Sequence, residues 1–343
     1  MNDVERPTTD DRGFFRVLIG DGRPLITLTG LCLALSGAFA IFQSATGHFL
    51  PHDISFLRMS AEELCGINEC RIVHYMFHDR VSFGGSLIAI AVLYLWLAAF
   101  PLAAGEAWAW WALVASGVTG FGSFLTYLGY GYLDTWHGAA TLCLLPCFAG
   151  GLRLSRRLVT EHAGETGRDV SPRSFPWLAP EPRWFSTAGF GRLALAATAA
   201  GMIGGGLTIQ TIGMTQVFVE TDLVYMGLSR QTLAAINPQL IPLIAHDRAG
   251  FGGGVATAGL LLLASVWCAR MTRSLWQALM TAGLVGWTTA IGVHPAIGYN
   301  DPWHLAPAVT GASLFMLGMI CAWDGQGSST RDPELRPEPR TDS

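Results

Sequence analysis

Long apolar segments decide what this chain of 343 residues can fold into. A helix needs about 20 mainly apolar residues to cross the hydrocarbon core of a bilayer, and several segments reach that length. Charged residues make up only 13% of the sequence, too few to cover the surface of a soluble protein of this size. The sequence therefore predicts an all-α integral membrane protein with the lipid bilayer as its main partner.

Eight transmembrane helices are predicted, at residues 25–46, 82–102, 107–128, 136–153, 191–213, 250–270, 274–294 and 304–323. All 21 basic residues are arginines. Seven of them lie around the connection between the fourth and fifth spans: Arg153, Arg156, Arg157, Arg168, Arg173, Arg183 and Arg192. By the positive-inside rule this connection and both termini are cytoplasmic. We expect a multi-pass protein of the plasma (inner) membrane, with residues 47–81 and 214–249 outside.

A sequence pattern occurs twice along the chain. HDRVSFGG at residues 78–85 matches HDRAGFGG at 246–253, and GYLDTWH at 131–137 matches GYNDPWH at 298–304. These repeats predict a tandem duplication of a four-helix unit, whose parallel copies are related by an axis along the membrane normal. The expected domains are a cytoplasmic N-terminal tail (1–23), a first four-helix bundle (24–153), a cytoplasmic linker (154–190), a second four-helix bundle (191–323) and a disordered cytoplasmic tail (324–343).

Four histidines occupy equivalent places in the two copies. His78 and His246 open the second and sixth spans, and His137 and His304 open the fourth and eighth. An ionisable residue within the membrane suggests a functional site, and bis-histidine haem ligation needs one imidazole from each of two helices. We therefore predict one or two b-type haems, with His78/His137 and His246/His304 as their axial ligands.

Small and basic neighbours support the haem interpretation. Gly85 and Gly253 each follow a histidine by seven residues, so they lie on its helix face roughly 10 Å deeper. Glycine there leaves room for a flat porphyrin. Arg80 and Arg248 are predicted to bind the haem propionates through their guanidinium groups. The alternative is that these arginines anchor helix ends or pair with Asp79 and Asp247.

Other polar residues of the outer side are candidates for proton and redox chemistry. His74 lies one turn before His78 and could exchange a proton near the haem edge, because the ordinary pKa of histidine is about 6.5. Tyr132 and Tyr299, which are present in both copies, are candidates for the same catalytic role. Cys65 and Cys70 lie in the first outer loop, where an oxidising compartment favours a disulfide and also allows a redox-active pair.

These features resemble the haem A synthase family. That family also has eight spans in two halves with histidines at the outer ends of every second span, and a cysteine pair in the first outer loop. Its Glu-x-x-x-His-Arg motif is similar to HYMFHDR at 74–80, where His74 replaces the glutamate, and its His-Leu-x-x-Ala pattern is similar to WHLAPA at 303–308. The resemblance implies a haem-binding membrane oxidoreductase or b-type cytochrome, with an electron-transfer partner or a larger membrane complex.

Two other classes of function stay open. The first is a metal-binding membrane enzyme in which the histidines and nearby carboxylates hold zinc or another divalent ion. Its additional ligands are four aspartates close in sequence to the histidines: Asp79, Asp134, Asp247 and Asp301. The second is a transporter or a structural subunit of a membrane complex, because duplicated halves are common in transporters. No motif for nucleic-acid binding is present.

Overall fold

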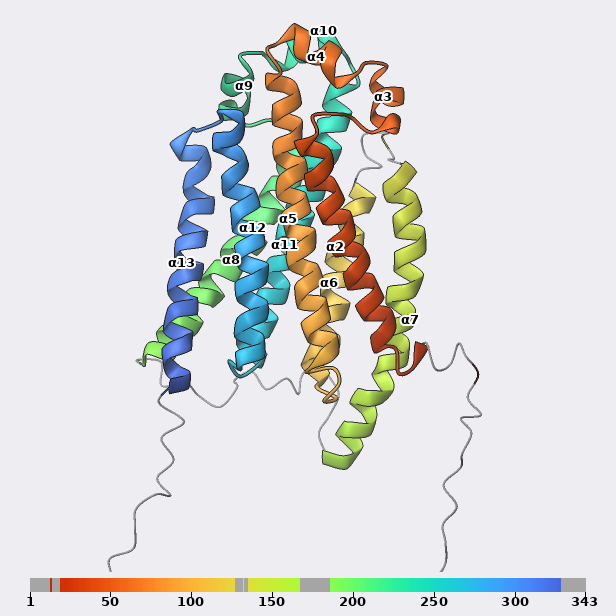
Figure 1. Ribbon diagram of the computed structural model, residues 1–343, viewed down its shortest axis with the longest axis vertical. Coiled ribbons are helices and arrows are strands. Elements are labelled where there is room, and N and C mark those ends of the chain that lie inside the picture. Colours follow the sequence, from red (N-terminus) through yellow and green to blue (C-terminus); the bar gives the residue numbers. More distant parts are fainter. Residues whose placement is uncertain (1–12, 14–18, 127–131, 133–134, 167–185, 328–343) are drawn as a thin grey trace, which may run out of the picture.

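The computed structural model describes residues 13, 19–126, 132, 135–166 and 186–327. All regular secondary structure within these residues is helical. The long helices are α2 (Arg23–Ala45), α5 (Arg71–Ala99), α6 (Ala107–Leu125), α7 (Thr135–Thr166), α8 (Thr187–Met214), α11 (Leu240–Cys268), α12 (Arg273–Ile297) and α13 (Pro302–Gly327). The short helices, which gather at one end of the bundle (Figure 1), are α3 (Pro51–Leu57), α4 (Ala61–Ile67), α9 (Glu220–Met226) and α10 (Arg230–Ile236).

Six of the helices in the described part of the chain are long and apolar enough to cross a membrane. They are α2, α5, α7, α8, α11 and α13. Their composition confirms the prediction of an all-helical, multi-pass membrane protein. Helices α6 and α12 run alongside them in the bundle and contain several Trp, Gly, Ser and Thr residues, which lower their hydropathy.

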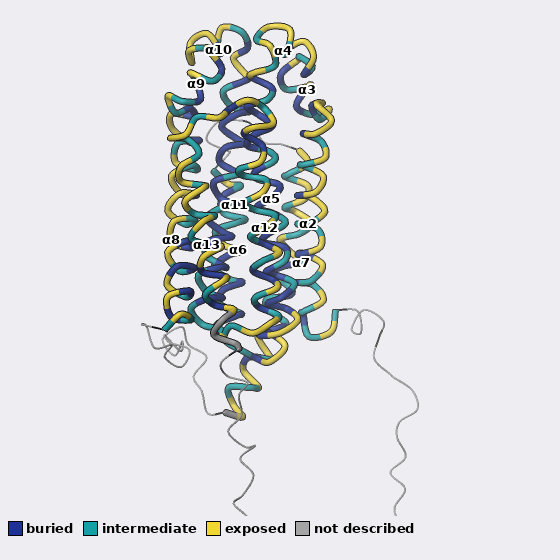
Figure 2. Tube along the Cα trace, turned by 60° about the vertical axis from the view of Figure 1, so that its left-hand side comes forward, coloured by how far each residue is buried: buried dark blue, intermediate teal, exposed yellow. Residues whose placement is uncertain are grey.

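Helices α5 and α11 form the centre of the bundle. Their most apolar segments are 72% and 61% buried, whereas those of the other four candidate spans are 17% to 28% buried, and Figure 2 shows the same contrast. Helix α5 packs against α2, α12 and α11, and helix α11 packs against α8, α6 and α5. Each central helix therefore contacts helices from both halves of the chain. These contacts between the halves decide which histidines lie close together.

The short helices cover the end of the bundle at which the histidines lie. Ser60 and Ser229 cap helices α4 and α10, because their hydroxyl groups accept hydrogen bonds from the backbone N–H groups of Glu63 and Thr232. Two asparagine amides then connect the halves of the chain. Asn68 donates to the carbonyl of Met226, and Asn237 donates to that of Leu57.

Several helices extend beyond the predicted spans. Helices α5 and α11 begin at Arg71 and Leu240, not at 82 and 250, so His78 and His246 lie within them and not at their starts. Arg80, Asp247 and Arg248, which lie before the predicted spans, pair inside the protein and need no contact with water, so they do not end the helices. Helices α7 and α13 likewise continue into the predicted linker at 154–190 and tail at 324–343.

Candidate metal centre

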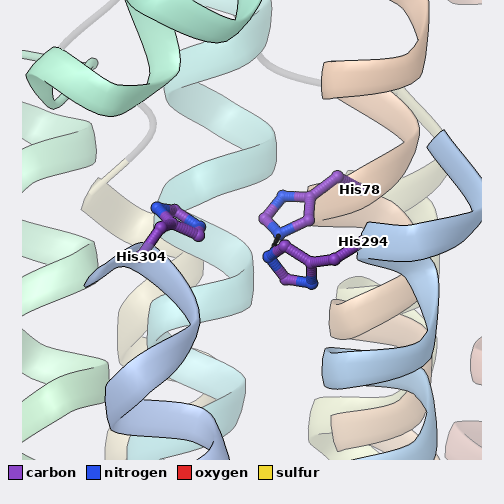
Figure 3. A group of neighbouring side chains, drawn as sticks. All are labelled: His78, His294 and His304. Carbon is purple, nitrogen blue, oxygen red and sulfur yellow. Dashed lines mark hydrogen bonds between the residues drawn. The ribbon is translucent and has the colours of Figure 1, made fainter. Parts of the chain in front are cut away.

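Three histidines from three helices converge near the covered end of the bundle. They are His78 of α5, His294 of α12 and His304 of α13, as Figure 3 shows. One ring nitrogen from each lies within 4.8 Å of the others, and the Nε2 atoms of His78 and His294 are 3.0 Å apart. His78 and His294 are each only 3% exposed. Two buried imidazoles and the half-buried imidazole of His304, brought together from three helices, are an arrangement typical of a metal site.

The outer nitrogens of two of these rings are bound by their surroundings. His78 donates its Nδ1–H to Oδ1 of Asp79, at 3.1 Å. His304 Nδ1 lies 3.0 Å from the hydroxyl oxygen of Tyr299, which itself donates to Oδ1 of Asp222 at 2.9 Å. When the tyrosine gives its one proton to Asp222, the matching tautomer of His304 carries its proton on Nδ1 and donates it to the tyrosine oxygen. Both histidines therefore keep an Nε2 lone pair for a metal, as ligating histidines with a bound second nitrogen do.

Charged residues of α9 and α11 keep this hydrogen-bond chain in place. Burial alone raises the pKa of Asp222, but the Arg248 guanidinium opposes it through charge and a hydrogen bond and brings the pKa below its usual value. Burial and the neighbouring Asp222 carboxylate raise the pKa of Tyr299 well above 10. The tyrosine thus stays protonated and the aspartate ionised at neutral pH.

A second histidine pair lies on the other side of α5 and α11. His137 Nδ1 of α7 and His246 Nε2 of α11 are 3.0 Å apart, and their rings are stacked with centroids 5.0 Å apart. The ring of Tyr132 lies 5.1 Å from that of His246, and its hydroxyl donates to Asp53. Among the described residues this pair has no third histidine ligand.

Two arginines connect the sites through the core. Arg80 donates from Nε to Asp247 at 2.8 Å and from Nη1 to Asp53 at 2.7 Å. Arg248 donates from Nη1 to Asp222, and its Nε lies 3.5 Å from Oδ2 of Asp79. Each arginine of one central helix therefore reaches the aspartate that follows the histidine on the other. The result is a buried polar layer across α5 and α11.

The structure corrects the predicted histidine pairs. His78 meets His294 and His304 instead of His137, and His246 meets His137 instead of His304. The cause is the packing of the central helices, because α5 lies against α12 and α11 lies against α6, so each directs its histidine toward the other half of the chain. The four histidines therefore belong to two sites, each of which combines residues from both halves of the chain.

The predicted haem environment differs from the observed one. Arg80 and Arg248 pair with buried carboxylates, as in the alternative interpretation, although each bonds the aspartate of the opposite helix. A side chain at Gly85 would overlap Thr289, and one at Gly253 would overlap Ser123, so neighbouring helices fill the space expected for a porphyrin. These two glycines allow close helix packing.

The remaining candidates have mixed outcomes. Tyr299 joins the cluster through His304, and Tyr132 lies beside the second pair. His74 is half-buried one turn before His78 and is not part of the three-histidine group. Asp301 caps helix α13 by accepting from the His304 backbone N–H at 2.7 Å, and Asp134 lies outside the described residues.

The segment between α2 and α5 contains the predicted disulfide. Cys65 and Cys70 are bonded to each other at the end of α4 and the beginning of α5. The bond fixes the turn that leads into the helix of His78. The other cysteines, Cys32, Cys143, Cys147, Cys268 and Cys321, are free thiols within the long helices.

Sequence reasoning missed His294. The repeat directed attention to residues that occur in both halves, whereas residues 117–136, which correspond to the end of α12, contain no histidine. A signal was available in principle, because GVHPAIGYNDPWH places His294 ten residues before His304, across a short helix–helix connection. Two histidines on either side of a tight connection lie close together in space.

No family model, curated protein or solved structure matches this chain. The resemblance to haem A synthases therefore stays a prediction, and the function has to be argued from the geometry of the site.

Proposed function

We propose that this chain is a membrane metalloprotein that binds a first-row transition-metal ion at His78, His294 and His304. The convergence of three imidazole nitrogens within 4.8 Å is the observation that carries the proposal. Imidazole donors suit zinc, copper, iron and nickel and disfavour magnesium and calcium. Three protein ligands leave a fourth position for water or a substrate, as in catalytic zinc sites.

The negative charge of the buried polar layer favours the binding of a cation. Its carboxylates are Asp53, Asp79, Asp222 and Asp247, and its guanidinium groups are Arg80 and Arg248. With neutral histidines and all four carboxylates ionised, the described residues of this layer carry two more negative than positive charges. Uncompensated buried charge is costly, and one divalent ion would balance the excess. A haem with two propionates would add negative charge instead.

The second candidate is haem at the His137/His246 pair, which presents one imidazole from each of two helices as bis-histidine ligation requires. The donors fit, but the space does not. Metal–imidazole bonds of about 2 Å place opposite axial nitrogens about 4 Å apart, farther than the observed 3.0 Å. The cavity near this pair holds about 40 Å³, whereas pockets for larger ligands hold about 300–1,000 Å³. Porphyrin binding would need α7 to move outward.

The architecture around the centre completes the proposal. We infer that α6 and α12 also span the membrane, which gives eight spans in two related four-helix units that arose by duplication. The equivalent Asp–Arg–Asp contacts on the two sides of α5 and α11 support this inference. With arginines concentrated between the fourth and fifth spans, both termini are cytoplasmic and the histidines lie near the outer face of the plasma (inner) membrane.

The test is metal and haem analysis of the purified full chain in detergent. We expect about one tightly bound transition-metal ion per chain by elemental analysis, or after titration of metal-free protein with zinc or copper. His294→Ala and His304→Ala should each abolish stoichiometric binding. His137→Ala, the matched control from the second pair, should retain it.

Two results would overturn the metal assignment. One is wild-type protein that binds neither zinc nor copper, and the other is unchanged binding in His294→Ala. A Soret band that disappears in both His137→Ala and His246→Ala would establish the haem candidate, and retention of that band in both variants would exclude it. A bound metal ion without a Soret band would support the metal centre and exclude the haem candidate.

A further inference from the structure

Two apolar cavities lie deeper in the bundle, one beneath each histidine site. The larger holds about 70 Å³ between α5, α8, α11, α12 and α13, and Ala290 in its wall is one helical turn from His294. The smaller holds about 40 Å³ between α2, α5, α6 and α11. Phe124 in its wall has its ring 5.9 Å from that of His137.

The two cavities have equivalent walls. Phe83 and Phe251, which hold the same place in the repeated HDRxxFGG pattern, line one cavity each. Gly120 and Gly286, from the matching GVTGF and GLVGW segments, do the same. A Cβ atom at Gly286 would find no atom nearer than 3.9 Å, and one at Gly120 none nearer than 3.5 Å. The neighbouring Gly283, by contrast, is packed tightly against Phe315.

The larger cavity offers little to a water molecule. Its side-chain hydroxyl belongs to Ser86, which already donates to the carbonyl of Ser82 at 3.0 Å. Trp287 adds one indole N–H to a wall that is otherwise built from Ala, Leu, Val, Met, Phe and Gly side chains. A buried water needs two to four polar partners. The cavity is therefore suited to an apolar occupant.

We propose that this cavity binds a small apolar molecule of the dioxygen class and holds it beside the metal centre. A volume of about 70 Å³ exceeds the roughly 30 Å³ share of one liquid water, so it accepts a molecule of two or three heavy atoms and no larger organic substrate. Such a molecule is soluble in the hydrocarbon core and can enter between the helices. The role of the bound molecule rests on the proposed metal centre. Its binding to the cavity can be tested without the metal.

The experiment measures xenon and dioxygen binding in the full chain reconstituted in detergent or nanodiscs. Xenon reports the cavity directly, and dissolved dioxygen broadens the indole N–H resonance of Trp287, which is assigned by Trp287→Phe. Gly286→Val fills the cavity, and Ala89→Val, from the facing wall, is a second filling variant. Gly120→Val is the matched control because it fills the smaller cavity only. Thermal unfolding confirms that each variant is folded.

We expect Gly286→Val and Ala89→Val to reduce xenon affinity of the larger cavity and the dioxygen effect on Trp287 at least tenfold, and Gly120→Val to change neither. Chelator-treated protein and His294→Ala should bind xenon and dioxygen as the wild type does. A failure of the metal proposal would therefore be distinguishable from a failure of the cavity proposal. Absence of both xenon binding and dioxygen broadening near Trp287 in wild type would overturn the inference. Equal effects in wild type and both filling variants would overturn it as well.

Discussion

Arg80 of α5 and Asp247 of α11 form a buried ion pair that joins the two halves of the chain. The guanidinium Nε lies 2.8 Å from Oδ2 of Asp247, and Nη1 reaches Asp53 at 2.7 Å. The arginine therefore holds a carboxylate from each half. Its position makes the polar layer a structural connection as well as the frame of the histidine sites.

Removal of this arginine should destabilise the protein strongly. Arg80→Ala leaves two buried carboxylates without their cation, and breaking a buried pair in this way costs about 3–5 kcal/mol. Thermal or denaturant unfolding in detergent measures the loss. Arg71→Ala is the control, because Arg71 pairs with the exposed Glu69 at 3.4 Å and such surface pairs contribute about 0–1 kcal/mol. Equal losses in the two variants would contradict the role of the buried layer.

Tyr299 should tune the metal centre without being a ligand. Tyr299→Phe removes the hydroxyl that links His304 to Asp222, so His304 loses the partner that fixes its Nδ1 proton. Changes of this kind typically cost about 10–100-fold in metal affinity. Zinc titration of metal-free protein provides the measurement. Tyr132→Phe, the equivalent change at the second pair, should leave zinc affinity unchanged, and a matching loss there would mean that the effect is general.

The class of fold follows from the sequence, but the pairing of the histidines does not. Hydropathy and the arginine distribution report how each segment meets lipid and water, and this is enough to predict a multi-pass helical protein. A repeat shows which residues are equivalent, yet it carries no information about which helices face each other. His78 therefore pairs across the halves, and Arg80 does so as well, through Asp247.

Single residues outside the repeat were also beyond prediction. His294 has no counterpart in the first half, and its proximity to His78 arises because α12 packs against α5. Gly85 shows a different limit, since a small residue beneath a histidine is equally consistent with an open pocket and with a close neighbouring helix. The side chain of Thr289 selects the second case, and only the three-dimensional packing reveals it.

Two glycines one turn apart on α12 should respond oppositely to substitution. A Cβ atom at Gly283 would overlap the ring of Phe315, whereas one at Gly286 enters open space. We expect Gly283→Ala to destabilise the protein by about 1–3 kcal/mol through overpacking. Gly286→Ala should be neutral or stabilise by up to about 1 kcal/mol, because alanine favours the helix more than glycine does. Unfolding midpoints in detergent compare them, and a larger loss for Gly286→Ala would contradict the observed packing.

The orientation of the chain can be tested at Ser60, the cap of helix α4. This residue lies in the cover of short helices near the histidine sites, at the opposite end of the bundle from the start of α8. By the positive-inside rule we expect the arginine-rich connection before α8 on the cytoplasmic side, so a cysteine at Ser60 should be accessible from outside. We expect Ser60→Cys to react with a membrane-impermeant maleimide in intact cells, and Ser274→Cys, near the start of α12 at the other end, to react only after permeabilisation.

Both variants are made in a background in which the five free cysteines are replaced by serine or alanine. Reaction of Ser60→Cys only after permeabilisation would invert the topology and move the metal centre to the cytoplasmic face.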